Sequence, residues 1–248
     1  MSEQPTRIFD LAERVSVPDP FTEIEQCREF DRTMRTQLII PMQHLMKLLT
    51  PHVSQAAEVL EVGCGPGLVS LRLAALHKQA EFVAVDANDR FLEVARENAI
   101  FANLVSYGGR FTCDYAHSNH LPFDDDSFDV VFSFCAVPRW RRPEKTIAEC
   151  ARVCRPGGTV VIYDLARDAD EGMISFVLQY SAGEADQFMR SLRSGYTVPE
   201  MRELLTGLGL GDWSVAREGI NLVVSSVPLG VNYAVGDPGI YEDIFTER

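Results

Sequence analysis

The sequence lacks two features that would place the protein at a membrane or outside the cell. No stretch approaches the roughly 18 consecutive apolar residues that a membrane-spanning helix requires. The opening residues, MSEQPTRIFD, contain no apolar segment of the kind found in secretory signals. We therefore expect a soluble, cytoplasmic protein with no membrane partner.

Basic residues are also few relative to acidic ones. The 248 residues include 23 Lys and Arg against 36 Asp and Glu, which gives a formal net charge of −13. Nucleic-acid binding depends heavily on basic surface that neutralises phosphates. The charge balance therefore argues against a nucleic-acid partner and favours a small-molecule substrate.

The six cysteines do not show the paired spacing of a zinc site. Cys150 and Cys154 are four residues apart in the segment AECARVC, on one face of an expected helix, but no further ligands lie nearby in the sequence. We predict no metal site, and we interpret the cysteines as core thiols in a reducing compartment.

Apolar segments of strand type alternate with segments of helical periodicity through the middle of the chain. The FDVVFSF segment at 128–134 is almost continuously apolar, as expected for a strand buried on both faces. Helix 143–154 is expected to end at Pro156, Gly157 and Gly158. The expected strands are 58–62, 81–87, 109–115, 128–134 and 159–164, and the expected helices between them are 68–76, 89–103 and 143–154. This alternation predicts an α/β fold with a Rossmann-like, doubly wound, mostly parallel sheet.

A glycine-rich turn lies between the first strand and the first helix of this region, in VLEVGCGPGLVSLRLA. Gly63, Gly65 and Gly67 alternate, and Leu68 stands where the dinucleotide fingerprint has its third glycine. No Lys follows at the offset that a triphosphate-binding loop requires. These departures argue against a turn that binds the pyrophosphate of a dinucleotide or a nucleoside triphosphate.

Three acids, one near the end of each of the first three expected strands, point to a different ligand. Glu61, two residues before Gly63, suits a cationic amino group. Asp86 ends the second strand, where a carboxylate accepts both hydroxyls of a ribose. Asp114 ends the third strand, within reach of an adenine amine. A cationic amino acid, an unphosphorylated ribose and an adenine together describe S-adenosylmethionine.

Four motifs in order resemble the class I S-adenosylmethionine-dependent methyltransferases: EVGCGPG (61–67), VAVDAN (83–88), CDYAHSNHLPFDDDSFDVV (113–131) and ARVCRPGGTVVIYD (151–164). The resemblance implies that the glycine turn contacts the methionine part, that the acid after strand two holds the ribose, and that strand four ends near the sulfonium. The cofactor residues implied are Glu61, Gly63, Gly65, Gly67, Asp86, Ala87, Asp114, Tyr115, Phe134 and Cys135. The product would be S-adenosylhomocysteine.

The resemblance also divides the single expected domain. The parts are an N-terminal arm and cap helices (1–56), a cofactor-binding core (57–164), a helical lid insertion (165–196), a closing helix and hairpin (197–228) and a tail (229–248). Residues 1–20 are expected to form a loose arm, and helices are expected from Phe21, from near Pro41 and within 173–180 and 184–193. Thr197 and Glu200 form a capping box, and an antiparallel hairpin around Gly219 brings the sheet to seven strands.

We expect methyl transfer by in-line displacement, driven mainly by proximity and orientation. The segment SFCAVPRW (133–140) lacks the Asn or Asp followed by Pro-Pro that marks the nucleobase amino-methylating branch. The motifs LPFDDDSFDVV and RVCRPGG most resemble those of a small-molecule branch of the family that includes quinone-biosynthesis enzymes. Residues 138–142 differ from that branch, because they replace a frequent His-containing turn. The alternatives are a methyltransferase for peptide, protein or RNA, and a non-catalytic cofactor binder. Aminopropyl transfer is disfavoured because a GGGDG loop is absent.

The segment PRWRRP (138–143) follows the fourth strand, and we interpret it as a candidate binding site for the methyl acceptor. Arg139 or Arg141 would clamp an anionic group of the acceptor while Trp140 packs against its ring. The alternative is a solvated turn whose arginines balance Asp124, Asp125 and Asp126. Further candidates for acceptor contact or for a base are His44, His117, His120, Tyr180 and Tyr196. None of them is assigned as a catalytic base.

Overall fold

Seven strands form one sheet in the order β3-β2-β1-β4-β5-β7-β6, in a computed structural model that describes residues 8–16, 20–102, 110–181 and 185–228. The expected tail (229–248) lies outside these residues. The strands are β1 (Glu58–Val62), β2 (Glu81–Asp86), β3 (Phe111–Tyr115), β4 (Phe128–Phe134), β5 (Cys154–Leu165), β6 (Ser214–Glu218) and β7 (Asn221–Ser225). The first five are parallel, and β7 pairs antiparallel with β5 and β6. The predicted doubly wound sheet with a closing hairpin is confirmed.

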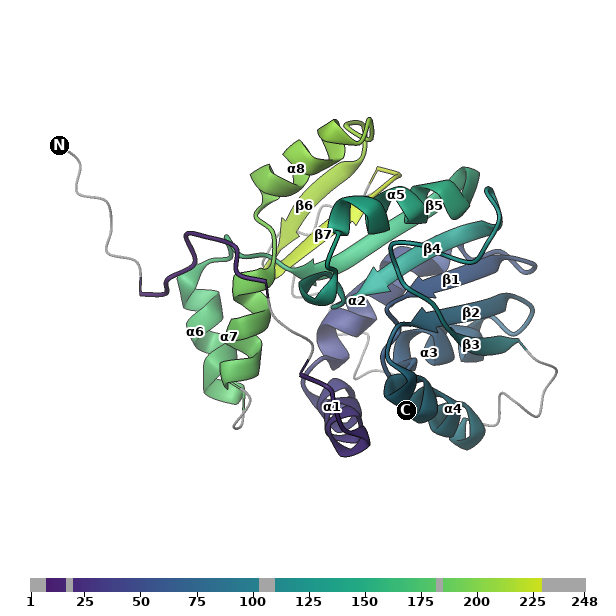
Figure 1. Ribbon diagram of the computed structural model, residues 1–248, viewed down its shortest axis with the longest axis horizontal. Coiled ribbons are helices and arrows are strands. Elements are labelled where there is room, and N and C mark those ends of the chain that lie inside the picture. Colours follow the sequence, from purple (N-terminus) through teal and green to yellow (C-terminus); the bar gives the residue numbers. More distant parts are fainter. Residues whose placement is uncertain (1–7, 17–19, 103–109, 182–184, 229–248) are drawn as a thin grey trace, which may run out of the picture.

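Helices cover both faces of the sheet (Figure 1). The helices are α1 (Ile24–Thr36), α2 (Ile39–Leu49), α3 (Leu68–Leu76), α4 (Asp89–Phe101), α5 (Pro143–Val153), α6 (Glu171–Tyr180), α7 (Ala185–Ser194) and α8 (Val198–Gly207), with short 3-10 turns η1 (Thr50–His52) and η3 (Val137–Arg139). Helices α2, α3 and α4 pack on one face, and α5 and α8 on the other. In the described part of the chain, none of these helices has the length and apolar character needed to cross a membrane.

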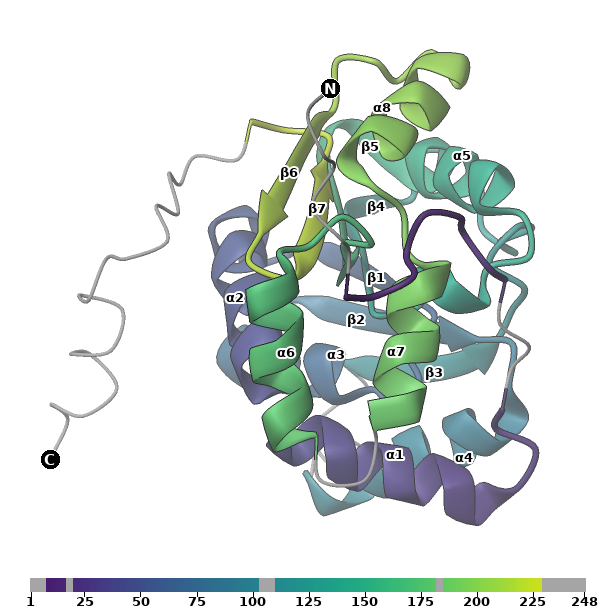
Figure 2. The same ribbon diagram turned by 90° about the vertical axis from the view of Figure 1, so that its left-hand side faces the viewer.

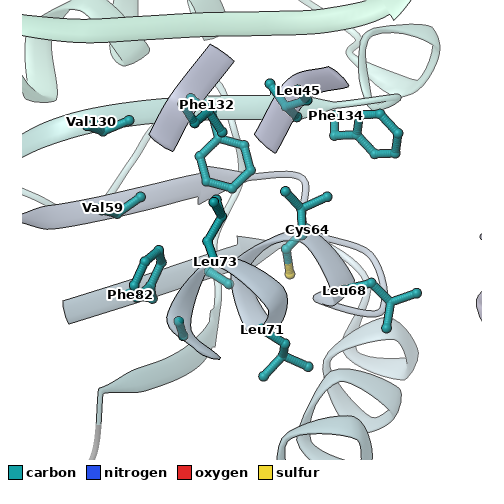
Figure 3. Packing of buried hydrophobic residues seen from close by; sticks show 14 of the residues in the cluster. Leu45, Val59, Cys64, Leu68, Leu71, Leu73, Phe82, Val130, Phe132 and Phe134 are labelled. Atoms are coloured by element: carbon teal, nitrogen blue, oxygen red, sulfur yellow. The ribbon is translucent and has the colours of Figure 1, made fainter. Parts of the chain in front are cut away.

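The larger core lies between the sheet and α2 and α3 (Figure 3). Leu73 of α3 and Leu45 of α2 are fully buried against strand residues such as Phe82 and Phe132. The near-continuous apolar sequence of β4 follows from its place between β1 and β5, where both of its faces are covered. This packing holds the carboxyl ends of β1 and β4 next to each other.

Strand β5 begins five residues earlier than predicted. It starts at Cys154, immediately after α5, and includes Pro156, Gly157 and Gly158. The register between β4 and β5 shifts between Phe128 and Val130. A Cβ at Gly158 would lie 2.7 Å from the Asp129 carbonyl oxygen, so the glycine permits a close approach of the two strands. Pro and Gly mark an irregularity within this strand, not the loop that the sequence suggested.

Residues 8–16 are packed rather than loose, contrary to the expectation for the arm. Leu11 is only 7% exposed, and Val15 N–H donates to the Arg193 carbonyl at 3.1 Å. Arg14 Nε donates to the Ser194 carbonyl at 2.8 Å. This segment therefore lies against the end of α7, as Figures 1 and 2 both show.

Helices α6 and α7 stand side by side across the end of the sheet (Figure 2). The predicted capping box at the start of α8 is confirmed, because Glu200 N–H donates to Thr197 Oγ1 and Thr197 N–H donates to Glu200 Oε2. Gly219 has φ of 57° in the turn between β6 and β7, as the predicted hairpin requires.

Candidate cofactor and acceptor site

The turn from β1 to α3, residues 63–67, depends on its three glycines. Gly63, Gly65 and Gly67 have φ values of 76°, 51° and 73°, a left-handed region that other L-residues rarely adopt. A Cβ on Gly63 would also lie 2.7 Å from Ala136 Cβ, in the segment that follows β4. The N–H groups of Gly63 and Cys64 both donate to the Val85 carbonyl, at 2.8 and 3.0 Å. We call these residues the glycine turn.

Asp86 lies at the end of β2 and holds the glycine turn directly. Its Oδ2 accepts from Gly65 N–H at 2.8 Å, and its Oδ1 accepts from Asn88 N–H at 2.9 Å. A carboxylate offers about four acceptor positions, so these two bonds leave its chemistry compatible with a ribose diol. Ala87, also predicted at the site, lies with Asn88 in the two-residue connection between β2 and α4.

Glu61 lies in β1, two residues before the glycine turn. The side chain is 1% exposed, and its Oε2 accepts from the N–H of Ser70 in α3 at 3.2 Å. Burial raises the pKa of this carboxyl to about 8. A cation bound above the turn would lower that pKa and favour the carboxylate form. The predicted role toward a cofactor amino group therefore depends on the charge of Glu61.

Asp114 and Tyr115 lie at the end of β3, the edge strand. Both are exposed, Tyr115 to 48%. Tyr115 pairs in register with Asp86, and its hydroxyl lies 3.1 Å from His117 Nε2. His120 N–H in turn donates to the His117 carbonyl at 3.0 Å. Both histidines thus belong to the loop beside the expected adenine end.

Phe134 and Cys135 end β4 beside the glycine turn. Phe134 is 4% exposed, with its ring centroid 6.0 Å from that of Tyr163. Cys135 has φ of 52°, which is unusual for a residue other than glycine. Strained backbone of this kind tends to occur at functional sites. Cys135 lies at the end of strand four, which the family resemblance predicts to be near the sulfonium of the cofactor.

Asp164 is a site residue that the sequence analysis did not single out. It ends β5, is 2% exposed, and accepts from Val137 N–H at 2.9 Å through Oδ2. Burial raises its pKa to about 6. This bond holds η3 and so orients Arg139 and Trp140. The place of Asp164 at the end of the IYD motif was the sequence signal that could have singled it out. The direction in which its side chain points depends on the fold.

Arg139 joins the end of β4 to a small pocket. One Nη2–H donates to the Cys135 carbonyl at 2.8 Å, and the guanidinium lies 5.5 and 5.7 Å from the ring centroids of Phe21 and Phe30. The pocket is lined by Pro20, Pro138, Arg139, Gln187, Arg190 and Ser191. Within the described ranges, neither Arg139 nor Arg190 has a carboxylate at ion-pair distance.

Within the described residues, Arg139, Arg141 and Arg142 form no ion pair with the acids at 124–126, which the alternative interpretation had them balance. Asp125 pairs instead with Arg152 of α5 at 2.9 Å. Arg155 of β5 donates to the Asp126 carbonyl at 3.1 Å. The acidic turn lies at the opposite end of β4 from residues 138–143.

Trp140 does not line the pocket. It is 5% exposed and packs in a cluster with Ala136, Val137 and Ile147. Its position therefore differs from the expected packing against an acceptor ring. The Nε1–H group is buried without an acceptor in the part of the chain that the structure describes, and it lies 3.9 Å from where a Gly63 Cβ would be.

The other acceptor candidates lie outside the pocket lining. Arg141 is exposed after η3, and Tyr180 is 67% exposed at the end of α6, 5.0 Å from the Phe176 ring. Tyr196 is half-buried under Arg14, whose guanidinium lies 4.4 Å from its ring centroid. His44 is half-buried on α2, where burial lowers its pKa. The structure does not bring these four residues together.

The residues at this edge fit S-adenosylmethionine. The glycine turn, the Asp86 carboxylate that accepts from it, and the buried Trp140 N–H without an acceptor in the described chain offer partners for a ligand with cationic, diol and carboxylate groups. In open α/β sheets, ligands bind across the carboxyl ends of the parallel strands, and these residues lie at that edge.

Comparison with known proteins finds a match for the central part of the chain. Residues 60–162 match the family model described as a methyltransferase domain. The chain is 32% identical over 148 residues to methyltransferase GfsG of Streptomyces halstedii, covering 60% of this chain and 48% of the relative. It is 33% identical over 140 residues to demethylmenaquinone methyltransferase of Clavibacter sepedonicus, covering 55% and 54%.

The match to these curated relatives spans about half of their length. Among solved structures, an S-adenosylmethionine-dependent methyltransferase from Aquifex aeolicus aligns with a TM-score of 0.59 and 18% identity, over 82% of this chain and 97% of that one. This likeness supports the fold.

Proposed function

We propose that this protein transfers a methyl group from S-adenosylmethionine to a small-molecule acceptor. The observation that carries the proposal is the contact between the pocket at Arg139 and the end of β4 beside the glycine turn. Arg139, which lines the pocket, donates to the carbonyl of Cys135, which adjoins the glycine turn across Ala136. An acceptor held at Arg139 would thus lie next to the end of β4.

The glycine turn would hold the amino-acid part of the cofactor, and Asp86 the ribose. Asp114 and Tyr115, at the exposed end of β3, would approach the adenine, and Phe134 and Cys135 the sulfonium. The bound cofactor supplies a methyl group already activated by a positively charged sulfur. The work of the protein is then to align the acceptor and exclude water.

The pocket favours an acceptor with an anionic or aromatic group. Arg139 and Arg190 offer guanidinium groups that are not paired with carboxylates in the described chain, in a protein of net charge −13. Guanidinium groups bind carboxylates and phosphates in bidentate fashion. The rings of Phe21 and Phe30 beside Arg139 add apolar surface. The name of one relative, a demethylmenaquinone methyltransferase, supports a small-molecule acceptor.

The cysteines support a reducing, cytoplasmic compartment. All six are free thiols, and five of them are buried. Buried thiols in such a compartment act as small apolar side chains.

The first test measures binding of S-adenosylhomocysteine by calorimetry. Asp86→Asn should weaken binding by about tenfold or more, because the carboxylate accepts charge-assisted hydrogen bonds. Asp124→Asn, in the acidic turn at the far end of β4, is the matched control and should bind like the wild type. Equal affinity in all three proteins would contradict the assignment of Asp86.

The second test identifies the acceptor class. Methyl-labelled S-adenosylmethionine is incubated with the protein and fractionated cell extract, and the label should appear in the small-molecule fraction. Label in protein or RNA instead would refute the small-molecule acceptor. With the acceptor known, Arg139→Ala and Arg190→Ala should raise its KM while leaving cofactor affinity unchanged, whereas Arg193→Ala should not. An unchanged KM in both variants would refute recognition by these arginines.

A further inference from the structure

Trp140 presents a buried hydrogen-bond donor to the glycine turn. The residue is 95% buried, since its exposed fraction is 5%. Its Nε1–H has no acceptor within the described residues and lies beside Gly63. Buried polar groups are almost always paired, because leaving one unpaired costs its full desolvation free energy. An orphaned donor beside a ligand site therefore points to an acceptor supplied by the ligand.

The position of Trp140 is set by the strand ends around it. Asp164 holds the N–H of Val137, and Trp140 N–H donates to the Val137 carbonyl at 3.1 Å. Ala136, two residues after Phe134, lies against Gly63. The indole is thus fixed relative to the glycine turn by β4, β5 and η3, and η3 also contacts α7.

The chemistry of the indole selects one group of the cofactor. An indole N–H donates and cannot accept, so it cannot pair with the ammonium group. The ribose is assigned to Asp86, and the adenine end lies toward β3, the far edge of the sheet from β4. The remaining strong acceptor at the glycine turn is the carboxylate. Because Glu61, Asp86 and Asp164 place acids around this edge, a carboxylate there requires a neutral or cationic donor.

We propose that Trp140 Nε1–H donates a hydrogen bond to the carboxylate of the amino-acid part of S-adenosylmethionine. The inference rests on the proposed function, because it presumes that this cofactor binds at the glycine turn. It changes the role of Trp140 from a contact with the acceptor to a contact with the cofactor.

The experiment follows the indole N–H by nitrogen-15 NMR. The chain has two tryptophans, Trp140 and Trp213, and the variant Trp213→Phe assigns the two indole signals. S-Adenosylhomocysteine should shift the Trp140 signal downfield and slow its exchange with deuterated water. 5′-Methylthioadenosine, which keeps the adenosine but lacks the amino-acid part, should leave that signal in place.

Affinity provides the second readout. Trp140→Phe should weaken binding of S-adenosylhomocysteine about tenfold, the equivalent of about 1.4 kcal/mol, and leave binding of methylthioadenosine within about twofold. Trp213→Phe should change neither. Retained methylthioadenosine binding also shows that the Trp140 variant is folded, and the NMR experiment on the unaltered residue does not depend on that variant.

The outcomes separate the two proposals. If S-adenosylhomocysteine binds but the Trp140 signal does not move, or moves equally with methylthioadenosine, the assignment of Trp140 is overturned while the cofactor site stands. If S-adenosylhomocysteine does not bind to the wild-type protein, the proposed function itself fails. A shift specific to the amino-acid part supports both.

Discussion

The glycine turn and the segments that cover it are held together in opposite ways. The turn (63–67) is fixed by backbone hydrogen bonds to Val85 of β2 and by the Asp86 carboxylate. The cover, which we define as residues 8–16, 165–181 and 185–196, is tied together by Arg167. Its side chain is 1% exposed and donates to the carbonyls of Leu11, Ala12 and Gly195, and to Glu200 of α8.

This difference has a functional meaning. The glycine turn lies within the region that matches the methyltransferase domain model, whereas all parts of the cover lie outside residues 60–162. Methyltransferases that share a cofactor need the same cofactor-binding edge of the sheet, while each different acceptor needs its own pocket. A cover held by a few side chains can change without disturbing the strands. Arg190 of α7, in the pocket, is an example of what the cover contributes.

The largest effect is expected from Arg167→Met. The change leaves the buried carbonyls of Leu11 and Gly195, the partly buried carbonyl of Ala12, and Glu200 without their donor. The free energy of unfolding should therefore fall by about 3–5 kcal/mol in urea denaturation. Hydrogen exchange should quicken in 8–16 and 185–196 but not in β1 or β4. The exposed neighbour Arg193→Met is the control. If exchange quickened equally in β1, the cover and the glycine turn would not be separate units.

Gly63→Ala should disturb the glycine turn and leave the cover intact. The left-handed φ of 76° costs an alanine about 1 kcal/mol, and the 2.7 Å approach to Ala136 should bring the loss of stability to about 2–3 kcal/mol. Gly209→Ala is the matched control, since it has φ of 75° but nothing within 4 Å of its Cβ position. Equal losses in thermal unfolding of the two variants would show that the contact with Ala136 is unimportant.

Glu61→Gln should alter the pH dependence of stability. In the wild type, burial raises the pKa of Glu61 from its ordinary value of 4.5 to about 8, so the folded protein binds this proton more tightly than the unfolded chain. The resulting stabilisation is complete at low pH and is lost as the pH rises through 8, by about 2 kcal/mol between pH 6 and pH 8. Gln keeps an oxygen for Ser70 N–H and removes this loss. Parallel pH profiles for wild type and variant, measured by urea denaturation, would contradict the burial argument.

The smallest effect is expected from Thr197→Ala at the start of α8. Removing the capping hydroxyl should lower the free energy of unfolding by about 1 kcal/mol. Glu200 would keep its contact with Arg167, so the cover should remain closed in hydrogen exchange. Thr206→Ala, near the other end of the same helix, is the comparison in the same denaturation assay. A loss as large as that of Arg167→Met would mean that the cap, and not the buried arginine, organises the cover.

Most of the sheet was predictable because its signals are local. Apolar runs indicated β1 and β4, the alternating glycines indicated the turn, and the position of Asp86 after the second strand placed it at the edge. The start of β5 was missed because Pro156 and two glycines are typical of loops, while the close approach to β4 that requires Gly158 is a tertiary contact. The packing of residues 8–16 was missed because their partner is Arg167, more than 150 residues away.

The sequence by itself determined the fold class, the glycine turn and the kind of cofactor, since each depends on residue types at short spacings along neighbouring strands. Only the tertiary structure decided which way Trp140 and Asp164 face, that Arg139 and Arg190 share a pocket, and that Arg167 closes the cover. These depend on side chains from distant segments meeting in one place. Their directions are set by strand order and helix packing, which residue spacing along the chain does not specify.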